Sequence, residues 1–310
     1  MKFIFAAVTA LCMIAAACAV NSLEQEFTCP IDGNVWKQRV ETSGSPRGLR
    51  LDLRQLGDVT DPPTMPQCPK CRFPLFSERL VEQADEPEKA RAFAHLRAFV
   101  RGADFQMLAP KFPSYFSLAL VQEFLHAPHR HIALSYQRAS WQAEDREAMC
   151  GRLLEKARGH FLAALAEMKP DDARFGEVAL LCGETERRLG KWDDAEKRFR
   201  DLQNDGEFKD PRKMRIVAMQ LKLIELRDSH PRAMDEKIEE PRAPVEPLPA
   251  FTSKATAEAE MPEVPLELPV DPGKPGLGLD FAVPPAISSG PPSPSGAAGR
   301  AARKGKGKSN

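Results

Sequence analysis

The 310-residue chain lacks a net charge, because 44 lysine and arginine side chains balance 44 aspartate and glutamate side chains. A protein whose whole surface coats nucleic acid needs an excess of cations to neutralise the phosphates. The balance therefore argues against general nucleic-acid binding and leaves room only for local basic patches.

Signatures of the common enzyme sites are also missing. The sequence contains no H-E-x-x-H helix, no glycine-rich phosphate loop and no Ser-His-Asp order typical of a hydrolase. Because no motif supplies a positive argument for catalysis, we expect a protein that is not an enzyme.

The last 70 residues lack Cys, Trp and Tyr but hold 14 of the 28 prolines. Such a segment buries too little apolar surface to offset an ordering cost of about 1–2 kcal/mol per residue, so we expect residues 236–310 to form a disordered tail. The tail ends in a basic cluster, which indicates a solubilising end or a weak contact with an acidic surface. No aromatic residue lies among these cations, so base stacking has no support. The cluster comprises Arg300, Arg303, Lys304, Lys306 and Lys308.

The first 20 residues read as a targeting segment. An uncharged, alanine-rich run from Phe3 to Val20 fits a secretory signal better than a spanning helix, which needs about 20 strongly apolar residues. The run ends in Ala-Ala-Ala-Cys18, which resembles a lipoprotein processing box and makes Cys18 a candidate for lipidation. We expect a cell-envelope protein, exported or lipid-anchored, with membrane contact through this segment. Ordinary cleavage and an uncleaved anchor are alternatives, and the protein is cytoplasmic if the segment is no true signal.

Two short motifs with cysteine carry most of the chemical signal. Cys68-Pro-Lys-Cys71 is a knuckle, a tight turn that directs two thiolates to one site, as in many zinc sites. Cys29-Pro-Ile-Asp32 repeats this frame with a carboxylate in the second ligand position. Cys29, Asp32, Cys68 and Cys71 together give a set of three sulfurs and one oxygen for a structural Zn²⁺ ion. Lys37, Lys70 and Arg72 are nearby cations that would offset the negative charge of that set.

Three other interpretations of the cysteines stay open. The two motifs are also compatible with a metal-free remnant of a zinc site. In an exported protein, Cys29, Cys68 and Cys71 would instead supply a disulfide and one free thiol. A redox pair at Cys68 and Cys71 is the third, although the strand-then-helix context of thioredoxin-type sites is missing.

The region around the two knuckles, residues 24–82, predicts a small zinc-ribbon-like β unit. Val35–Val40 partly alternates between apolar and polar residues, Gly44–Gly48 contains breakers, and Leu49–Leu53 alternates cleanly, so strands are expected on either side of the break. A unit this small has little core, and a metal staple suits it.

Residues 85–235 predict a helical domain. Phe93, Leu96, Phe99 and Val100 form one stripe at helical spacing, and similar patterns cover 116–125 and 132–141. The run from Gly183 to Phe199 has a small residue, a turn at a glycine and then aromatic, Ala and Phe positions, which is the tetratricopeptide hairpin pattern. Ala157, Phe161 and Ala164 repeat its second half upstream. We expect a mainly α protein with three or four such hairpins, the β unit acting as the N-terminal cap of the stack.

The knuckle followed by helical hairpins, with GETERRLGKWDDAEKRF near the end, resembles the bacterial family called domain of unknown function 2225. The resemblance covers about residues 26–228. That family has Cys at both positions of each knuckle and Gly-aromatic after the second, so Asp32 and the Arg72-Phe73-Pro74 run are departures. What the resemblance implies is a metal-stapled interaction module without an assigned activity.

The remaining histidines, cysteines and clustered charges carry weaker functional signals. His126, His129 and His131 flank a proline at a spacing that can bring two imidazoles together, but we expect exposed or capping side chains. Cys150 and Cys182 are expected to be buried fillers. The charges of 184–188 are expected to form a solvated face.

The leading functional hypothesis is a scaffold whose helical groove binds a protein partner. The alternatives are an envelope metallo- or thiol-enzyme that uses Cys68 and Cys71, and nucleic-acid binding through the ribbon and the basic tail end.

Overall fold

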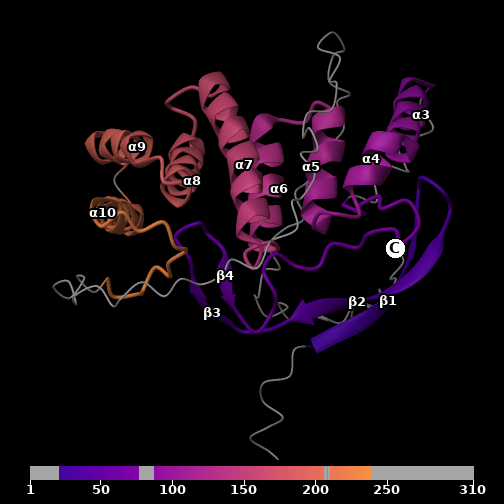
Figure 1. Ribbon diagram of the computed structural model, residues 1–310, viewed down its shortest axis with the longest axis horizontal. Coiled ribbons are helices and arrows are strands. Elements are labelled where there is room, and N and C mark those ends of the chain that lie inside the picture. The colour runs from indigo at the N-terminus through magenta and orange to yellow at the C-terminus, as the bar shows by residue number, and fades with distance from the viewer. Residues whose placement is uncertain (1–20, 77–86, 206–207, 209, 239–310) are drawn as a thin grey trace, which may run out of the picture.

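The computed structural model describes residues 21–76, 87–205, 208 and 210–238. In this part of the chain four short strands precede eight helices (Figure 1), which confirms the predicted mainly α class with a small N-terminal β unit. The predictions for residues 1–20, including Cys18, and for the tail beyond residue 238 lie outside the described residues. The strands are β1 (Asn21–Thr28), β2 (Val35–Ser43), β3 (Pro46–Leu49) and β4 (Gln55–Gly57).

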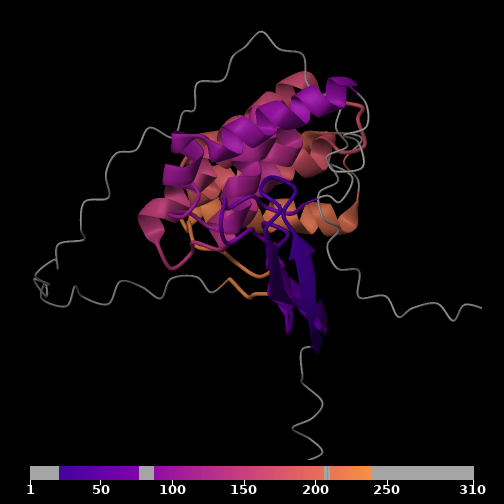
Figure 2. The ribbon, with the colours of Figure 1, turned by 90° about the vertical axis from the view of Figure 1, so that its right-hand side faces the viewer.

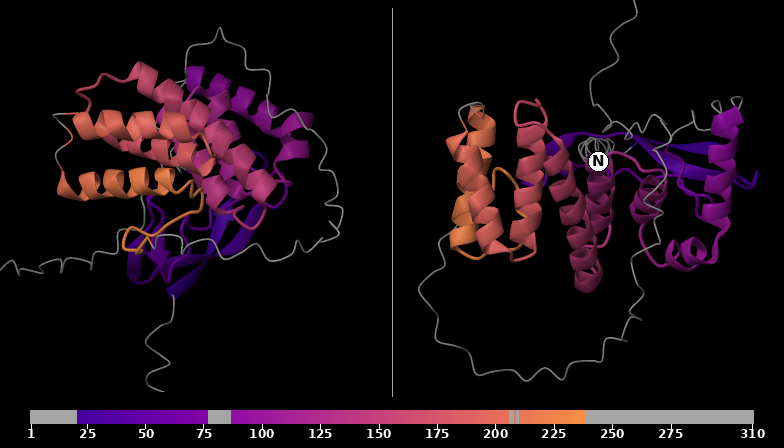
Figure 3. Two further views of the ribbon diagram at one scale, coloured as in Figure 1. Left: turned by 60° about the vertical axis from the view of Figure 1, so that its left-hand side comes forward. Right: turned by 90° about the horizontal axis from the view of Figure 1, so that it is seen from above.

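The helices run from Pro87 to Glu225, and none in the described ranges has both the length and the apolarity needed to cross a bilayer. Most of them stand side by side in a curved layer above the strands (Figures 1 and 3). They are α3 (Pro87–Arg101), α4 (Ala103–Leu108), α5 (Ser114–Phe124), α6 (His129–Trp141), α7 (Glu147–Glu167), α8 (Phe175–Arg188), α9 (Trp192–Asn204) and α10 (Pro211–Glu225).

The strands form two separate antiparallel pairs, β1 with β2 and β3 with β4. In the first pair Leu23 lies opposite Val40 and Phe27 opposite Trp36, so these side chains share one face of the ribbon. Phe27 and Trp36 stack with their ring centroids 5.5 Å apart. The opposite face carries the charged pairs Glu24 with Arg39 and Glu26 with Lys37.

The predicted strand boundaries are wrong in the second pair. The presumed breaker contains β3, and the alternating run that follows contributes only Leu49 to a strand. From Arg50 the chain turns, with the Leu53 amide donating to the Arg50 carbonyl at 3.0 Å and Leu53 at φ 66°. The apolar/polar alternation corresponds to neither a strand nor a buried face here, because the consecutive residues Arg50, Leu51 and Asp52 are all buried in this turn.

The predicted hairpin of α8 and α9 is present, and its glycines explain the spacing of the motif. A Cβ atom on Gly183 would lie 2.7 Å from the Phe199 ring, so only glycine lets the two helices approach this closely. Gly190 has φ +70° in the connecting turn, a conformation that glycine adopts without strain. Phe199 is fully buried. The membership of these hairpins in the tetratricopeptide class stays a prediction.

The β unit does not cap one end of the helical stack, as the sequence suggested, but extends along its base (Figures 1 and 2). Near the knuckles, Gln67 donates to Ser117 of α5 at 3.0 Å. At the other end, the Leu51 amide donates to the carbonyl of Arg232, beyond α10, at 3.0 Å. The segment after α10 therefore returns to the strands, and the β unit contacts both ends of the helical layer.

The charges of α8 are buried, which corrects the expectation of a solvated face. Glu184, Glu186 and Arg187 each expose 1% of their surface or less. Arg187 donates to both carboxylate oxygens of Glu184, at 2.8 and 2.9 Å, and to the His230 carbonyl beyond α10. Glu186 accepts two bonds from Arg198 of α9, at 2.8 and 2.9 Å. These charges hold neighbouring elements together, because a buried charge needs a partner.

Candidate metal centre

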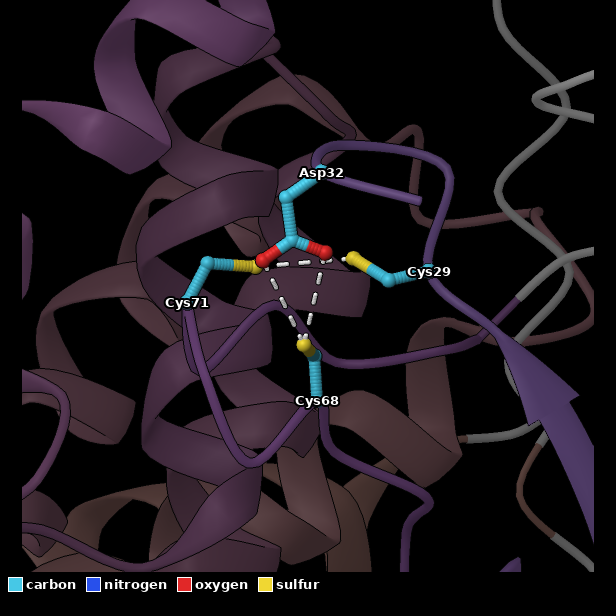
Figure 4. A group of neighbouring side chains, drawn as sticks. All are labelled: Cys29, Asp32, Cys68 and Cys71. Carbon is cyan, nitrogen blue, oxygen red and sulfur yellow. Dashed lines mark hydrogen bonds between the residues drawn. The ribbon is translucent and has the colours of Figure 1, made fainter. Parts of the chain in front are cut away.

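The four residues proposed as ligands from the sequence converge on one point (Figure 4). One ligand atom from each of Cys29, Asp32, Cys68 and Cys71 can be chosen so that all four lie within 4.8 Å of one another. Among the described residues, these four form the group of His, Cys, Asp and Glu side chains whose ligand atoms lie close enough together to hold a metal ion. The two sequence motifs, 36 positions apart from Asp32 to Cys68, thus meet in space.

The two turns that supply the ligands have the same backbone geometry. In the first, the Gly33 amide donates to the Cys29 carbonyl at 2.9 Å and the Cys29 amide donates to the Asn34 carbonyl at 2.8 Å. In the second, the Arg72 amide donates to the Cys68 carbonyl at 2.9 Å and the Cys68 amide to the Phe73 carbonyl at 2.9 Å. The same turn therefore occurs twice and presents two ligand positions each time.

The fifth residue of each turn has a left-handed backbone. Gly33 has φ +73° and Arg72 has φ 62° at the equivalent position. Glycine reaches this region freely, whereas a residue with a Cβ atom is strained there. The absence of a glycine after the second knuckle, noted in the sequence, thus leaves the turn intact at an energetic cost.

The separations between ligand atoms suit a tetrahedral ion. The Sγ atoms of Cys29 and Cys71 are 3.5 Å apart, and the Sγ atom of Cys68 lies 3.7 and 3.8 Å from the two carboxylate oxygens of Asp32. Zinc–sulfur bonds of about 2.3 Å and zinc–oxygen bonds of about 2.0–2.2 Å place tetrahedral ligands about 3.5–3.8 Å apart. The side chains are therefore arranged as a four-coordinate zinc site requires.

Of the three thiols at the site, only Cys29 has a pKa below its ordinary value. The thiol of Cys71 beside Cys29 lowers the pKa of Cys29 to about 7, against the effect of burial, and backbone amides of the first turn assist. The proton stays on Cys71, whose pKa is raised by Cys29 and by burial. Burial also raises the pKa of Cys68, although the amides of Lys70 and Cys71 oppose it. A metal ion would displace the remaining thiol protons, because the thiolate is the ligand.

Asp32 is fixed by its own backbone. Its Oδ1 atom accepts the Asn34 amide at 3.0 Å, which leaves Oδ2 free of backbone bonds. Burial raises the pKa of Asp32, but this amide, the neighbouring thiols and the charge of Lys70 outweigh it, so the pKa is lowered. The carboxylate is thus charged and oriented, and of the three cations expected nearby, Lys70 acts on it.

Helical residues hold the two knuckles against the domain. Arg101 of α3 donates to the Ile31 carbonyl at 3.1 Å. Gln106 of α4 donates through one amide nitrogen to the Cys71 carbonyl at 2.8 Å and to the Val100 carbonyl at 2.6 Å. Sequence reasoning missed both side chains, because no local pattern marks a side chain that bonds a distant carbonyl.

The apolar surroundings of the site are continuous with the main core. Ile31 and Phe73, each 1% exposed, pack in the same cluster as Leu96 and Val100 of α3. Cys29, Cys68 and Cys71 are themselves 1%, 0% and 6% exposed. The site is therefore a junction between the β unit and the first helices, closed to solvent on the sulfur side.

The histidines form a different arrangement from the one suggested by the sequence. His129 contacts His160 of α7 with their Nδ1 atoms 2.8 Å apart, and the Nε2 atom of His160 lies 3.0 Å from Glu123. Glu123 also accepts the hydroxyl of Tyr136 at 2.8 Å. His131 lies instead beside Arg130, 3.1 Å from its guanidinium. The partner of His129 is distant in sequence, so spacing alone did not reveal it.

Cys150 and Cys182 are buried as expected, at 6% and 0% exposure. Burial raises the pKa of Cys150 and raises that of Cys182 to about 12, so both thiols are protonated and inert.

Comparison of the chain with protein-family models, with curated proteins and with solved structures gives no match. The resemblance to domain of unknown function 2225 therefore stays a prediction.

Proposed function

We propose that Cys29, Asp32, Cys68 and Cys71 bind one structural Zn²⁺ ion, and that the protein is a non-enzymatic scaffold for protein interactions stapled by this metal. The observation that carries the proposal is the convergence of four ligand atoms within 4.8 Å from two turns of the same geometry. Zinc is the ion for which a mononuclear, sulfur-rich tetrahedral set is typical.

Burial favours a structural role over a catalytic one. A catalytic zinc keeps one position for water, whereas four protein ligands close the coordination shell. Reactive thiols are partly exposed and have a lowered pKa, but Cys68 is fully buried and its pKa is raised. A thiol enzyme that uses Cys68 and Cys71 therefore has less support than a staple.

The bound metal ion would stabilise the β unit, which has little hydrophobic core of its own. The four strands belong to two separate pairs, and a two-stranded ribbon is only marginally stable alone. An ion shared by the two knuckles would fix the ribbon on α3 and α4, where Arg101 and Gln106 already bond the ligand turns. The helical layer would then present a fixed surface to a protein or peptide partner, in a cell-envelope protein as the N-terminal segment predicts.

The decisive experiment is the metal content of the purified full-length chain and its variants. We expect about one zinc per parent chain, loss of zinc in Cys68→Ser, weaker binding in Asp32→Asn and retained binding in Asp32→Cys. Asp32→Asn keeps an oxygen for the Asn34 amide, so it tests the charge of the ligand rather than the turn.

Cys150→Ala is the matched control, because Cys150 and Cys71 have the same 6% exposure but only Cys71 belongs to the site. We expect this variant to retain zinc. A chelator should lower the melting temperature of the parent and leave that of Cys68→Ser unchanged. Equal zinc in the parent and Cys68→Ser would refute the ligand set.

Nucleic-acid binding through the ribbon and the tail is the competing proposal, and the salt dependence of any association tests it. Binding to phosphates weakens steeply with salt, in proportion to the number of contacts. Association that salt leaves unchanged would favour the protein partner.

A further inference from the structure

Three neighbouring helices bring two histidines together within the helical layer. Helices α5, α6 and α7 pack against one another in chain order (Figure 1). His129, the first residue of α6, and His160 of α7 face each other with their Nδ1 atoms 2.8 Å apart and their ring centroids 5.1 Å apart. Two ring nitrogens at this distance form a hydrogen bond, so one of them carries a proton and the other accepts it.

Glu123 of α5 determines which ring is the acceptor. Its Oε1 atom lies 2.8 Å from the hydroxyl of Tyr136 and 3.0 Å from the Nε2 atom of His160. Burial, reinforced by the charge of Glu123, raises the pKa of Tyr136 well above its ordinary value, so the hydroxyl keeps its proton and donates a hydrogen bond. Because a carboxylate only accepts, His160 donates to it through Nε2–H. In a neutral imidazole the other nitrogen is then an acceptor, and His160 presents the lone pair of Nδ1 to His129.

His129 is therefore the donor of the pair, and its second nitrogen has room for one more proton. Its Nδ1–H points to His160, and its Nε2 atom lies 3.6 Å from a carboxylate oxygen of Glu167. A proton added at Nε2 makes His129 a cation beside that carboxylate. It also strengthens the bond to His160, because a charged donor forms a stronger hydrogen bond than a neutral one. The two rings thus stay in contact whether His129 is neutral or protonated.

A second proton has a different effect, because it must bind to the accepting Nδ1 atom of His160. Two N–H groups and two positive rings then meet without an acceptor between them. Cations on both helices add to this repulsion, since Lys156 lies one helical turn before His160 and Arg130 follows His129. His129 also begins α6, and the N-terminus of a helix disfavours a positive charge. The doubly protonated pair is therefore expected to separate.

The exposure of the side chains indicates which ring moves. The side chain of His129 is 37% exposed, whereas those of His160 and Glu123 are 18% and 13% exposed. A protonated His160 keeps its bond to the Glu123 carboxylate, and that bond becomes charge-assisted. His129 is thus the ring that turns outward, and the contact between the first turn of α6 and α7 is lost with it.

The neighbouring His131 does not take part in this response. Burial, Arg130 and Arg174 lower the pKa of His131, so its ring stays neutral as the pair takes up protons.

We propose that His129 and His160 form a pH-sensitive latch between α6 and α7. Above the range near pH 6.5 in which imidazoles take up protons, the latch is closed and holds the first turn of α6 on α7. Below that range the second proton opens it, while Glu123 keeps its bonds from Tyr136 and His160. None of these residues is a proposed zinc ligand, so the latch and the metal site are independent proposals.

Hydrogen exchange of the full-length chain at about pH 7.5 and about pH 5.5 tests the latch at the amides of Ile132 and Ala133, in the first turns of α6. After correction for the intrinsic rate of each amide, we expect exchange in the parent to be about tenfold faster at the lower pH. In His160→Gln the side-chain amide can still donate to Glu123 but takes up no proton. The corrected rates of this variant should therefore be nearly equal at the two pH values.

His95→Gln is the matched control, because it removes an exposed histidine of α3. It should respond to pH as the parent does, and the amides of α9 serve as an internal standard for global unfolding.

Equal corrected rates at the two pH values in the parent would overturn the proposal. The same pH response in the parent and in His160→Gln would also overturn it, because it would assign the effect to other groups or to loss of zinc, which acid releases from both chains alike. The proton positions of the parent are checked directly by long-range proton–nitrogen NMR of the imidazole rings. We expect His160 to carry its proton on Nε2 at about pH 7.5, and a proton on Nδ1 instead would contradict the latch.

Discussion

Arg50 and Glu144, 94 positions apart, form a bidentate ion pair that joins the β unit to the helical layer. The guanidinium donates to both carboxylate oxygens, at 2.7 and 3.0 Å. Arg50 also donates to Asp52 at 2.6 and 3.1 Å, and Arg54 donates to Glu144 at 2.6 Å. Since Arg188 of α8 lies 3.5 Å from both acids, this cluster ties the turn after β3 to the loop before α7 and to α8. It is a second attachment of the β unit, at the end away from the knuckles.

Glu144→Gln should destabilise the protein by about 2–3 kcal/mol, because the three arginines lose a charged acceptor in a partly buried site. Burial raises the pKa of Glu144, but Arg50, Arg54 and Arg188 outweigh it and hold the pKa below its ordinary value of 4.5. The carboxylate therefore contributes stability above pH 4.5, and this contribution is lost as the pH falls through the lowered pKa. Urea unfolding from pH 3 to 7 should show a flatter acid limb in the variant.

Glu155→Gln is the control for this prediction. Glu155 of α7 forms an ion pair with Lys191 at 3.1 Å, but its side chain is 49% exposed. An exposed pair contributes less than about 1 kcal/mol, so the free energy of unfolding should change little. A loss in Glu144→Gln no larger than in Glu155→Gln would show that the Arg50 cluster does not hold the β unit.

Gly183→Ala should destabilise the α8–α9 hairpin even though alanine favours helices. The new Cβ atom would lie 2.7 Å from the Phe199 ring, which is fully buried and cannot move aside freely. Overpacking of this kind costs about 1–3 kcal/mol. In Gly151→Ala of α7, the added Cβ atom has no neighbour within 4 Å, so this control should gain up to about 1 kcal/mol. Thermal unfolding of the two variants should give shifts of opposite sign; a gain in both would contradict the proposed close approach.

The sequence predicted the features whose cause is local. Each knuckle is complete within six residues, and the two turns hold their ligands through their own amides. The contact of Gly183 with Phe199 was also predictable, because it lies within one pair of adjacent helices, α8 and α9. The convergence of Asp32 with Cys68 was predictable because the first motif repeats the frame of the second.

Features that depend on distant contacts were not predictable in this way. The charges at 184–187 have the composition of a solvated surface, and only the packing of α8 between neighbours buries them. Arg187 donates hydrogen bonds to the carbonyls of Asp228 and His230, which lie more than 40 positions away in the sequence. No sequence pattern predicts such distant acceptors. The position of the β unit along the base of the helices likewise depends on pairs such as Arg50 with Glu144.

The strain at Arg72 gives a last prediction, which compares the two knuckles. Arg72 has φ 62°, where a residue with a Cβ atom costs about 1–2 kcal/mol, so Arg72→Gly should stabilise the protein by up to about 1 kcal/mol. Arg72→Ala keeps the strain and should leave the free energy of unfolding nearly unchanged. Gly33→Ala should lose about 1 kcal/mol for the same backbone reason, since no atom lies within 4 Å of the added Cβ. Chemical denaturation with zinc present measures all three; if Arg72→Gly is less stable than Arg72→Ala, the side chain rather than the backbone governs the second turn.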